Sequence, residues 1–153
     1  MLRTYYIGAG TNLGDKVLNM ENAMNYLNTP PLGIKALSTL HNFKAWGYTS
    51  DNEFLNACFV IETELGPQEL LEHLKQYEKE QGRERSTEYA DRIIDMDILL
   101  CEGLVWWSEA LIIPHPLLQK REFVLVPLCE INEELVHPLL HKSMKQLLDE
   151  LMC

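Results

Sequence analysis

The chain has 153 residues, of which 46% are hydrophobic, and a formal net charge of −10 at pH 7. This length and hydrophobic content predict one globular domain over residues 1–153 with an adequate core. The negative charge excludes the basic surface that nucleic acids and anionic membranes require, and no apolar run approaches the roughly 20 residues of a membrane helix.

Hydrophobic patterns divide the first two thirds of the chain into six elements. Asp15 is suited to cap a helix, because its carboxylate can accept a free N–H group of the first turn. Gly66-Pro67 opens a second helix and Gly82 ends it, because proline is well tolerated at the first helical position and glycine is a natural stop. The predicted elements are a strand over 4–9, a helix over 16–27, strands over 35–43 and 54–64, a helix over 67–81 and a strand over 92–100.

This β-α-β-β-α-β order is typical of the split βαβ motif of a ferredoxin-like sheet. The last third adds a hairpin-like piece over 104–107 that leads into 111–116, a short apolar run over 123–128, and a terminal helix with Met144 and Leu151 on one face. We therefore predict an α+β fold with a ferredoxin-like core and additional C-terminal strands and helix. The polar residues 83–92 predict a mobile loop before the last core strand.

Two carboxylates, Asp95 and Asp97, interrupt the apolar strand over 92–100. Side chains alternate between the two faces of a strand, so both aspartates point to one face while Met96 and Ile98 point to the other. Two like charges on one face of an apolar strand are costly, because burial and mutual repulsion both oppose ionisation. A hard divalent cation between the two carboxylates is the simplest way to neutralise them, and magnesium next to a phosphate chain is the most familiar example.

Several of the chain's 13 basic residues flank this acidic pair. The planar arginine side chain binds phosphate oxygens in a bidentate manner, so arginines beside a magnesium site favour a site that holds phosphates as well. The alternative is a solvated network of ion pairs with neighbouring glutamates. The basic residues concerned are Lys79, Arg83, Arg85 and Arg92, with Lys120 and Arg121 as a second small cluster.

Aromatic residues beside a polar anchor indicate a second, flat substrate. Phe54 and Asn56 share one strand face, Phe123 offers a second ring, and Trp46 or Tyr89 can close the site from a loop. Two rings and an amide suit a planar heterocycle, although ordinary core packing of Phe54 and Phe123 is the alternative. The glycine-rich run over 8–14 lacks the spacing of a phosphate-binding loop, so we interpret it as a turn from strand to helix.

These residues occur in an order that resembles a known family. The run over 6–15, Asn56, Arg83, the Arg92-x-x-Asp95-x-Asp97-Ile98-Leu99 segment and the stretch from Pro114-His115-Pro116 to Leu128 resemble 6-hydroxymethyl-7,8-dihydropterin pyrophosphokinase. The resemblance covers nearly the whole chain. It implies an enzyme of folate biosynthesis that transfers pyrophosphate from Mg-ATP to the hydroxymethyl group of the pterin and leaves AMP.

The resemblance also implies roles for individual residues. Asp95 and Asp97 match ligands of two magnesium ions, and Arg83 and Arg92 match catalytic arginines that close over the triphosphate. The residues matched to pterin binding are Trp46, Phe54, Asn56 and Phe123. The residues matched to ATP binding are Glu78, Arg85, Ile98, His115 and Arg121.

The chain departs from the family pattern just before the acidic strand. The family usually has Gly-Pro-Arg there, and this chain has Ala90-Asp91-Arg92, which we expect to affect closure of the loop. Ser86 and Tyr89 stand where a lysine and a tryptophan are common. Elsewhere, Phe43-Lys44-Ala45 replaces a Thr-x-Pro element, and Ala110 and Ile112 replace polar contacts to the nucleotide. None of these changes alters the metal ligands or the core arginines.

The expected partners are the small molecules ATP and the hydroxymethyl pterin, with no nucleic acid and no membrane. We expect a monomer, with a dimer as the alternative.

The four cysteines lack zinc-ligand spacing and the N-terminus lacks a signal-peptide layout, so we expect a cytoplasmic protein with free thiols. Two other functions are weighed against the pyrophosphokinase: a ligand-sensing module, because ferredoxin-like sheets often serve that purpose, and another nucleotide-dependent transferase with a different flat acceptor.

Overall fold

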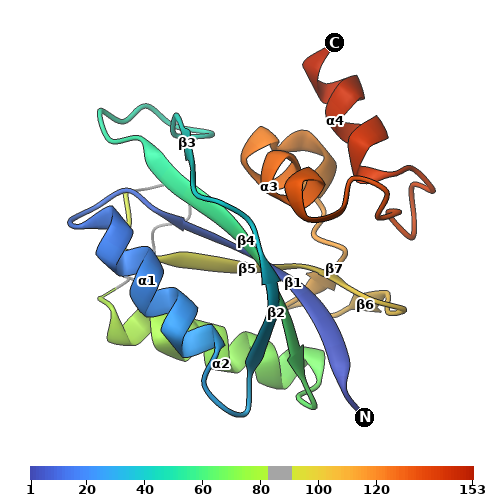
Figure 1. Cartoon of the computed structure of the whole chain (residues 1–153), viewed down its shortest axis with the longest axis horizontal. Coiled ribbons are helices and arrows are strands. Elements are labelled where there is room, and N and C mark those ends of the chain that lie inside the picture. Colours follow the sequence, from blue (N-terminus) through green and yellow to red (C-terminus); the bar gives the residue numbers. More distant parts are fainter. Residues whose placement is uncertain (83–90) are drawn as a thin grey trace.

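An antiparallel sheet organises the chain, and the computed structural model describes residues 1–82 and 91–153 (Figure 1). The sheet has five strands in the order β2-β4-β1-β5, and β3 pairs with the first residues of β4. The strands are β1 Arg3–Thr11, β2 Gly33–Leu37, β3 His41–Phe43, β4 Phe54–Thr63 and β5 Asp95–Cys101. The mixed helix-and-sheet class predicted from the sequence is confirmed.

Helices cover the two faces of this sheet. Figure 1 shows α1 (Lys16–Leu27) and α2 (Pro67–Glu80) on one side, and α3 (Glu122–Asn132) with α4 (Met144–Met152) on the other. Both helix starts predicted from the sequence are confirmed. The Leu18 N–H donates to the Asp15 carboxylate at 3.1 Å, and Pro67 opens α2 directly after Gly66.

Side-chain alternation along β1 divides the interior into two cores. Tyr5, Ile7 and Ala9 are buried with the inner faces of α1 and α2. Tyr6 lies on the opposite face, in a second core with Leu125 of α3. Each buried aliphatic or aromatic side chain contributes about 1.5–3 kcal/mol to folding, so both layers hold the sheet in place.

The second face lacks bulky side chains toward the end of β1. Gly8 and Gly10 follow Tyr6 at alternate positions of that face. A Cβ atom at Gly10 would lie 2.7 Å from Nδ2 of Asn56, which is closer than real Cβ atoms come. Beyond the core with α3, the sheet therefore leaves space above Gly10, and polar residues of β4 and β5 surround that space.

The C-terminal third contains more helix than the sequence indicated. β6 (Trp106–Trp107) and β7 (Ile112–Ile113) form a small two-stranded sheet, followed by a 3-10 turn over Leu118–Lys120. The apolar run over 123–128, to which no element was assigned, forms the body of α3 with Pro127 inside the helix. The predicted terminal helix is α4, whose first turn is capped by Ser143.

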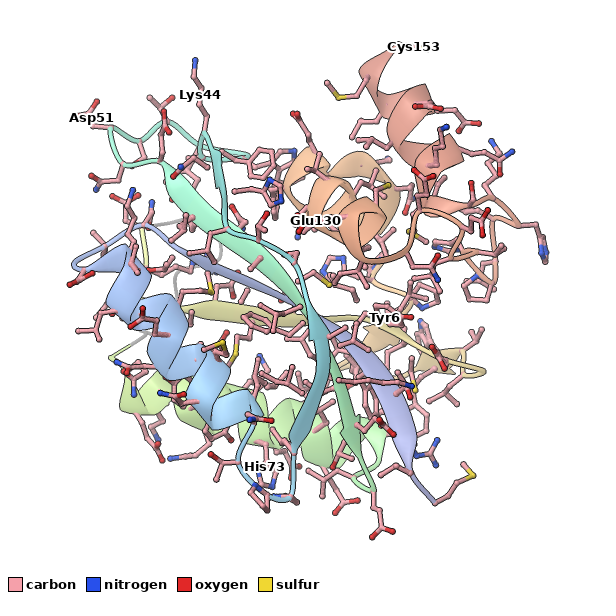
Figure 2. All side chains as sticks on the ribbon, viewed as in Figure 1. Tyr6, Lys44, Asp51, His73, Glu130 and Cys153 are labelled. Carbon is pink, nitrogen blue, oxygen red and sulfur yellow. The ribbon has the colours of Figure 1, made fainter. Side chains whose placement is uncertain are left out.

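Two predicted strand boundaries are wrong. The strand expected over 35–43 divides into β2 and β3, because the Thr39 N–H donates at 2.7 Å to the carboxylate of Glu130. Figure 2 shows Glu130 on α3, beside the sheet. The last core strand begins at Asp95 and not at Arg92. The Arg92 N–H and C=O groups bond to Asn12, at 2.7 and 3.0 Å, so they do not enter the ladder between β1 and β5.

All four cysteines are free, with Cys58 and Cys101 buried and Cys153 exposed. In the parts of the chain that the structure describes, none of the helices has both the length and the apolar character needed to cross a membrane.

Candidate active site

Two pockets lie on either side of the acidic pair on β5. The first, which we call the aromatic pocket, is lined by Phe54 and Asn56 of β4, Trp46 of the 44–53 loop, and Phe123 of α3. These are the four residues that the sequence predicted for a flat substrate. Gly10, Arg92 and Asp95 form the wall toward β1 and β5.

The rings of the aromatic pocket come in two edge-to-face pairs. The Trp46 and Phe123 centroids are 6.4 Å apart, with an angle of 63° between their planes. Tyr48 meets Phe54 at 6.5 Å and 86°. The Arg121 guanidinium lies 4.6 Å from the Trp46 centroid, a distance at which the positive charge is attracted to the ring face. A planar, polar-edged molecule fits a pocket of this kind.

Asn56 is the polar anchor of the aromatic pocket. Its side chain is buried, and its Nδ2 group donates to the Ala9 carbonyl at 3.5 Å. Within residues 1–82 and 91–153, Oδ1 of Asn56 has no hydrogen-bond partner. A buried acceptor left in this state costs about 1–3 kcal/mol, which a ligand N–H donor would recover.

The acidic pair has the geometry predicted from strand alternation. Met96 and Ile98 are buried in the core with α1 and α2, whereas Asp95 and Asp97 are partly exposed on the other face. An Arg92 nitrogen lies 3.2 Å from Oδ1 of Asp95. An Arg121 nitrogen lies 4.0 Å from Oδ2 of Asp97. Each carboxylate therefore has an arginine beside it.

The second pocket, which we call the edge pocket, lies along β5 at the edge of the sheet. Asp97 and Ile98 line it together with Glu78 of α2 and His115. Glu78 is 4% exposed, and its Oε2 atom accepts the Met96 N–H at 2.7 Å, which ties α2 to the strand that carries the aspartates. Asp95 thus faces the aromatic pocket and Asp97 faces the edge pocket.

His115 is neutral at physiological pH. Burial, reinforced by the Arg121 charge, lowers the pKa of His115 to about 4. Its Nδ1 atom accepts the Leu117 N–H at 3.1 Å, so in the neutral ring Nε2 carries the proton and is a donor.

The depressed pKa of His115 predicts a loss of stability in mild acid. The unfolded chain binds the proton near pH 6.5, so stability falls as the pH drops from about 6.5 to about 4, by on the order of 3 kcal/mol for this group. His115→Asn keeps an acceptor for the Leu117 N–H but does not titrate. Its melting temperature should fall less over this range than that of the wild type, as measured by thermal unfolding. Parallel curves for the two proteins would contradict the assignment.

Some predicted site residues fall elsewhere or outside the description. Arg83 and Arg85 lie outside the described residues, as does most of the predicted 83–92 loop with Ser86 and Tyr89. Arg121, predicted for the nucleotide, lines the aromatic pocket and reaches toward Asp97. All of the other predicted residues line one of the two pockets.

The sequence missed Asn12, which is buried and bonds to both backbone groups of Arg92. It also missed Tyr48 and Lys44 as lining residues. A polar residue inside the glycine-rich run over 8–14 was the available signal for Asn12. That signal was weak, because asparagine is common in turns.

An aromatic pocket and a second pocket, each with one carboxylate of the pair in its wall, suit a class of protein that brings two small molecules together, such as a transferase. A solved structure, Plasmodium falciparum HPPK-DHPS A437G, has a similar fold, with a TM-score of 0.77 and 16% identity. The likeness covers 98% of this chain and 45% of that longer chain, and it shows the fold alone.

The sequence comparisons identify the family. A protein from Aquifex aeolicus named 2-amino-4-hydroxy-6-hydroxymethyldihydropteridine pyrophosphokinase is 39% identical over 145 residues, 95% of this chain and 90% of that protein. One of the same name from Methylorubrum extorquens is 41% identical over 132 residues, 86% of this chain and 84% of that protein. The chain belongs to the 7,8-dihydro-6-hydroxymethylpterin-pyrophosphokinase (HPPK) family, whose model matches residues 6–133.

The chain is therefore an ATP-dependent pyrophosphokinase of folate biosynthesis, as its resemblance implied. This family membership favours the enzyme over the ligand-sensing module and over a transferase with another acceptor.

Proposed function

We propose that the aromatic pocket binds 6-hydroxymethyl-7,8-dihydropterin and that the edge pocket binds ATP. The observation that carries this proposal is that Trp46, Phe54, Asn56 and Phe123 line one pocket whose wall includes Asp95. The rings supply apolar surface for the faces of the pterin. The Oδ1 atom of Asn56 accepts an N–H at its edge.

In the edge pocket, Ile98 supplies apolar surface and His115 supplies a neutral Nε2–H donor for an oxygen of the nucleotide. Glu78 supports the site from below, since it accepts the Met96 N–H within β5. Asp97 lies at the pocket wall, where the phosphate chain would approach the acceptor.

Two magnesium ions are assigned to Asp95 and Asp97. Among residues 1–82 and 91–153, no group of three or more histidine, cysteine or acidic side chains could form a closed metal cage. Two carboxylates on one face fit magnesium, which usually keeps several waters and is held by one or two carboxylates plus substrate phosphates. When bound, the ions would neutralise charge that develops on the phosphate oxygens.

The reaction transfers the pyrophosphoryl group in one displacement. The hydroxymethyl oxygen bonds to the β-phosphorus, the bond from that phosphorus to the bridging α-oxygen breaks, and AMP leaves with that oxygen. The hydroxyl proton passes to solvent. Phosphoryl-type transfer needs positioning and charge neutralisation more than covalent help, and Arg92 and Arg83 are assigned to that charge.

The direct test is to incubate the protein with ATP, magnesium and the hydroxymethyl pterin. We expect AMP and the pterin diphosphate in equal amounts, and no product when the metal is chelated. Release of ADP would contradict the proposed displacement at the β-phosphorus. Full turnover in the presence of a chelator would contradict the assignment of magnesium.

Gly10→Ala tests the position of the pterin. The new Cβ would meet Nδ2 of Asn56 at 2.7 Å, so the buried amide must move. We expect the Kd of the pterin to rise by about tenfold, the equivalent of one lost hydrogen bond of about 1.4 kcal/mol, with little change for ATP. Gly8→Ala on the same strand face is the matched control, because the three atoms nearest its Cβ all belong to Leu99, the first at 3.2 Å. Equal pterin affinities in the two variants would contradict this placement.

The remaining features of the proposal concern the whole chain. The β2-β4-β1-β5 order, with α1 and α2 as crossovers, supports a ferredoxin-like core within a single domain over 1–153. We propose a cytoplasmic monomer, and sedimentation of the purified protein would distinguish it from a dimer.

A further inference from the structure

The Asp91 carboxylate gathers side-chain hydrogen bonds from two distant segments. Oδ1 accepts from Ser50 at 2.7 Å, from Asn12 at 2.8 Å and from Tyr48 at 3.0 Å. Oδ2 accepts from Asn52 at 3.1 Å. Asn12 directly follows β1, whereas the other three donors belong to the 44–53 loop. One charged group thus joins that loop to the chain just before β5.

The same carboxylate is connected to Arg92 through Asn12. The Asn12 side chain accepts the Arg92 N–H at 2.7 Å, and its backbone N–H donates to the Arg92 carbonyl at 3.0 Å. Its Nδ2 group donates to Asp91 at 2.8 Å and also lies within hydrogen-bond distance of the Tyr48 hydroxyl, at 3.3 Å, and the Asn52 carbonyl, at 3.4 Å. Both polar ends of this buried amide are therefore used. The backbone from which the Arg92 guanidinium reaches Asp95, at 3.2 Å, is held in place on both sides.

The 44–53 loop carries one wall of the aromatic pocket. Trp46 and Tyr48 line the pocket, and the Tyr48 ring packs edge-to-face on Phe54. Tyr48 uses its hydroxyl group on Asp91 and its ring on the pocket. Asp91 thus bonds to a residue of the wall, although it is not itself among the residues that line the pocket.

The hydrogen bonds to Asp91 are charge-assisted. The bond from Ser50, followed by those from Asn12, Asn52 and Tyr48, lowers the pKa of the Asp91 carboxyl below its ordinary value. The group is thus ionised at neutral pH. Hydrogen bonds to an ionised acceptor are roughly twice as strong as those between neutral groups.

We propose that Asp91 is a positioning residue that holds the Trp46–Tyr48 wall and Arg92 in the arrangement required for the acceptor to bind beside Asp95. The inference rests on the proposed placement of the pterin in the aromatic pocket. Asp91 acts through Tyr48 and Asn12 by preorganisation: a wall that is already ordered costs less free energy to order on binding.

Asp91→Ala removes all four hydrogen bonds and is the main test. We expect the Kd and KM of the pterin to rise by about tenfold or more, while the Kd of Mg-ATP changes by less than about twofold. Asp91→Asn keeps Oδ1 as an acceptor and should fall between the wild type and the alanine variant. Isothermal titration calorimetry gives the two Kd values, and AMP release gives KM and kcat.

Asp51→Ala is the matched control, because Asp51 is an exposed carboxylate at the outer end of the same loop (Figure 2). It should bind the pterin as the wild type does. Ser50→Ala removes the hydroxyl that donates to Asp91. This variant replaces Asp91→Ala as the test if Asp91→Ala does not fold. In the Asp91→Ala background, Ser50→Ala should cause a smaller loss than it does in the wild type, since both changes remove the Ser50–Asp91 bond and only the bond from the Asn52 N–H to the Ser50 hydroxyl is left to lose.

A folded Asp91→Ala variant whose pterin Kd equals that of the wild type would overturn the inference. Equal losses for pterin and Mg-ATP would also overturn it, because they would indicate general damage to the fold. Failure of the proposed function has a different signature: substitutions of Asn56 inside the pocket would then leave pterin binding unchanged in the wild-type background.

Discussion

Asp97→Asn is expected to reduce AMP formation by about 10³-fold or more, because it removes the charge of a proposed metal ligand without changing the size of the side chain. Asp97 is partly exposed on the open face of β5, with 37% of its side chain accessible. The substitution should therefore leave the melting temperature within a few degrees of the wild type. Quenched-flow or steady-state measurement of AMP release provides the rate, and circular dichroism provides the stability.

Glu64→Gln is the control for this prediction, since Glu64 is an exposed carboxylate directly after β4, far along the strand from the pocket. It should show the wild-type rate. A rate for Asp97→Asn within tenfold of the wild type would remove Asp97 from the metal site. Raising the magnesium concentration offers a second readout, because a weakened site should recover part of its rate at higher metal.

Asn56→Asp is expected to weaken pterin binding by about 10²-fold, since the site would lose the only donors of this side chain and place a charge in a buried pocket. The shape of the side chain is unchanged, and Asn56 lies in the middle of the site on β4. The Kd of Mg-ATP should change by less than about threefold, because the edge pocket does not include this residue. Calorimetric titrations with each substrate measure both values.

Asn42→Asp provides the comparison, because Asn42 lies on β3 with its side chain exposed and carries the same chemical change. Normal pterin binding by Asn56→Asp would contradict a requirement for a neutral amide at the anchor. A large loss in both variants would show instead that added negative charge near the sheet repels the substrates.

Local patterns predicted the acidic strand well. Alternation alone placed Asp95 and Asp97 on one face and Met96 and Ile98 in the core, because a strand has no other way to orient neighbouring side chains. The proline at the start of α2 and the cap at Asp15 also act on residues next to them in the sequence, so the helix starts were predicted correctly.

Features that depend on distant contacts could not be predicted in this way. The strand over 35–43 is interrupted at Thr39 by a hydrogen bond to Glu130, which lies 91 residues away. The run over 123–128 is too short for its hydrophobic pattern to distinguish a helix from a strand, and it contains Pro127. In the structure these residues form α3, which packs in the second core.

The candidate site shows the same division. Four side chains of the aromatic pocket were predicted from their chemistry and the nucleotide residues of the edge pocket from the family resemblance, but Asn12 and Asp91, which hold the aromatic pocket, were assigned no such role. Asn12 gives only a weak local signal, since its role depends on a contact with Arg92, 80 residues later. Asp91 was noticed as a departure from the family pattern. Its four donors lie between 39 and 79 residues away, so the sequence alone could not connect them.

Because β1 lies between β4 and β5 in the sheet, it fixes the distance between Asn56 and Asp95 in the candidate site. Gly10 is paired with Asn56 on one side and with Asp95 on the other, so the three residues form one row across three strands. Neighbouring strands are about 4.8 Å apart, which separates the Asn56 and Asp95 backbones by about 10 Å. Backbone hydrogen bonds fix this span, and no side-chain rotation can change it. An acceptor with one more methylene between ring and hydroxyl would place its oxygen roughly 1 Å too far along, which is enough to cost about a hundredfold in rate. With the acceptor placed as proposed, the fixed spacing of the strands would thus select the length of the link between its ring and its hydroxyl group.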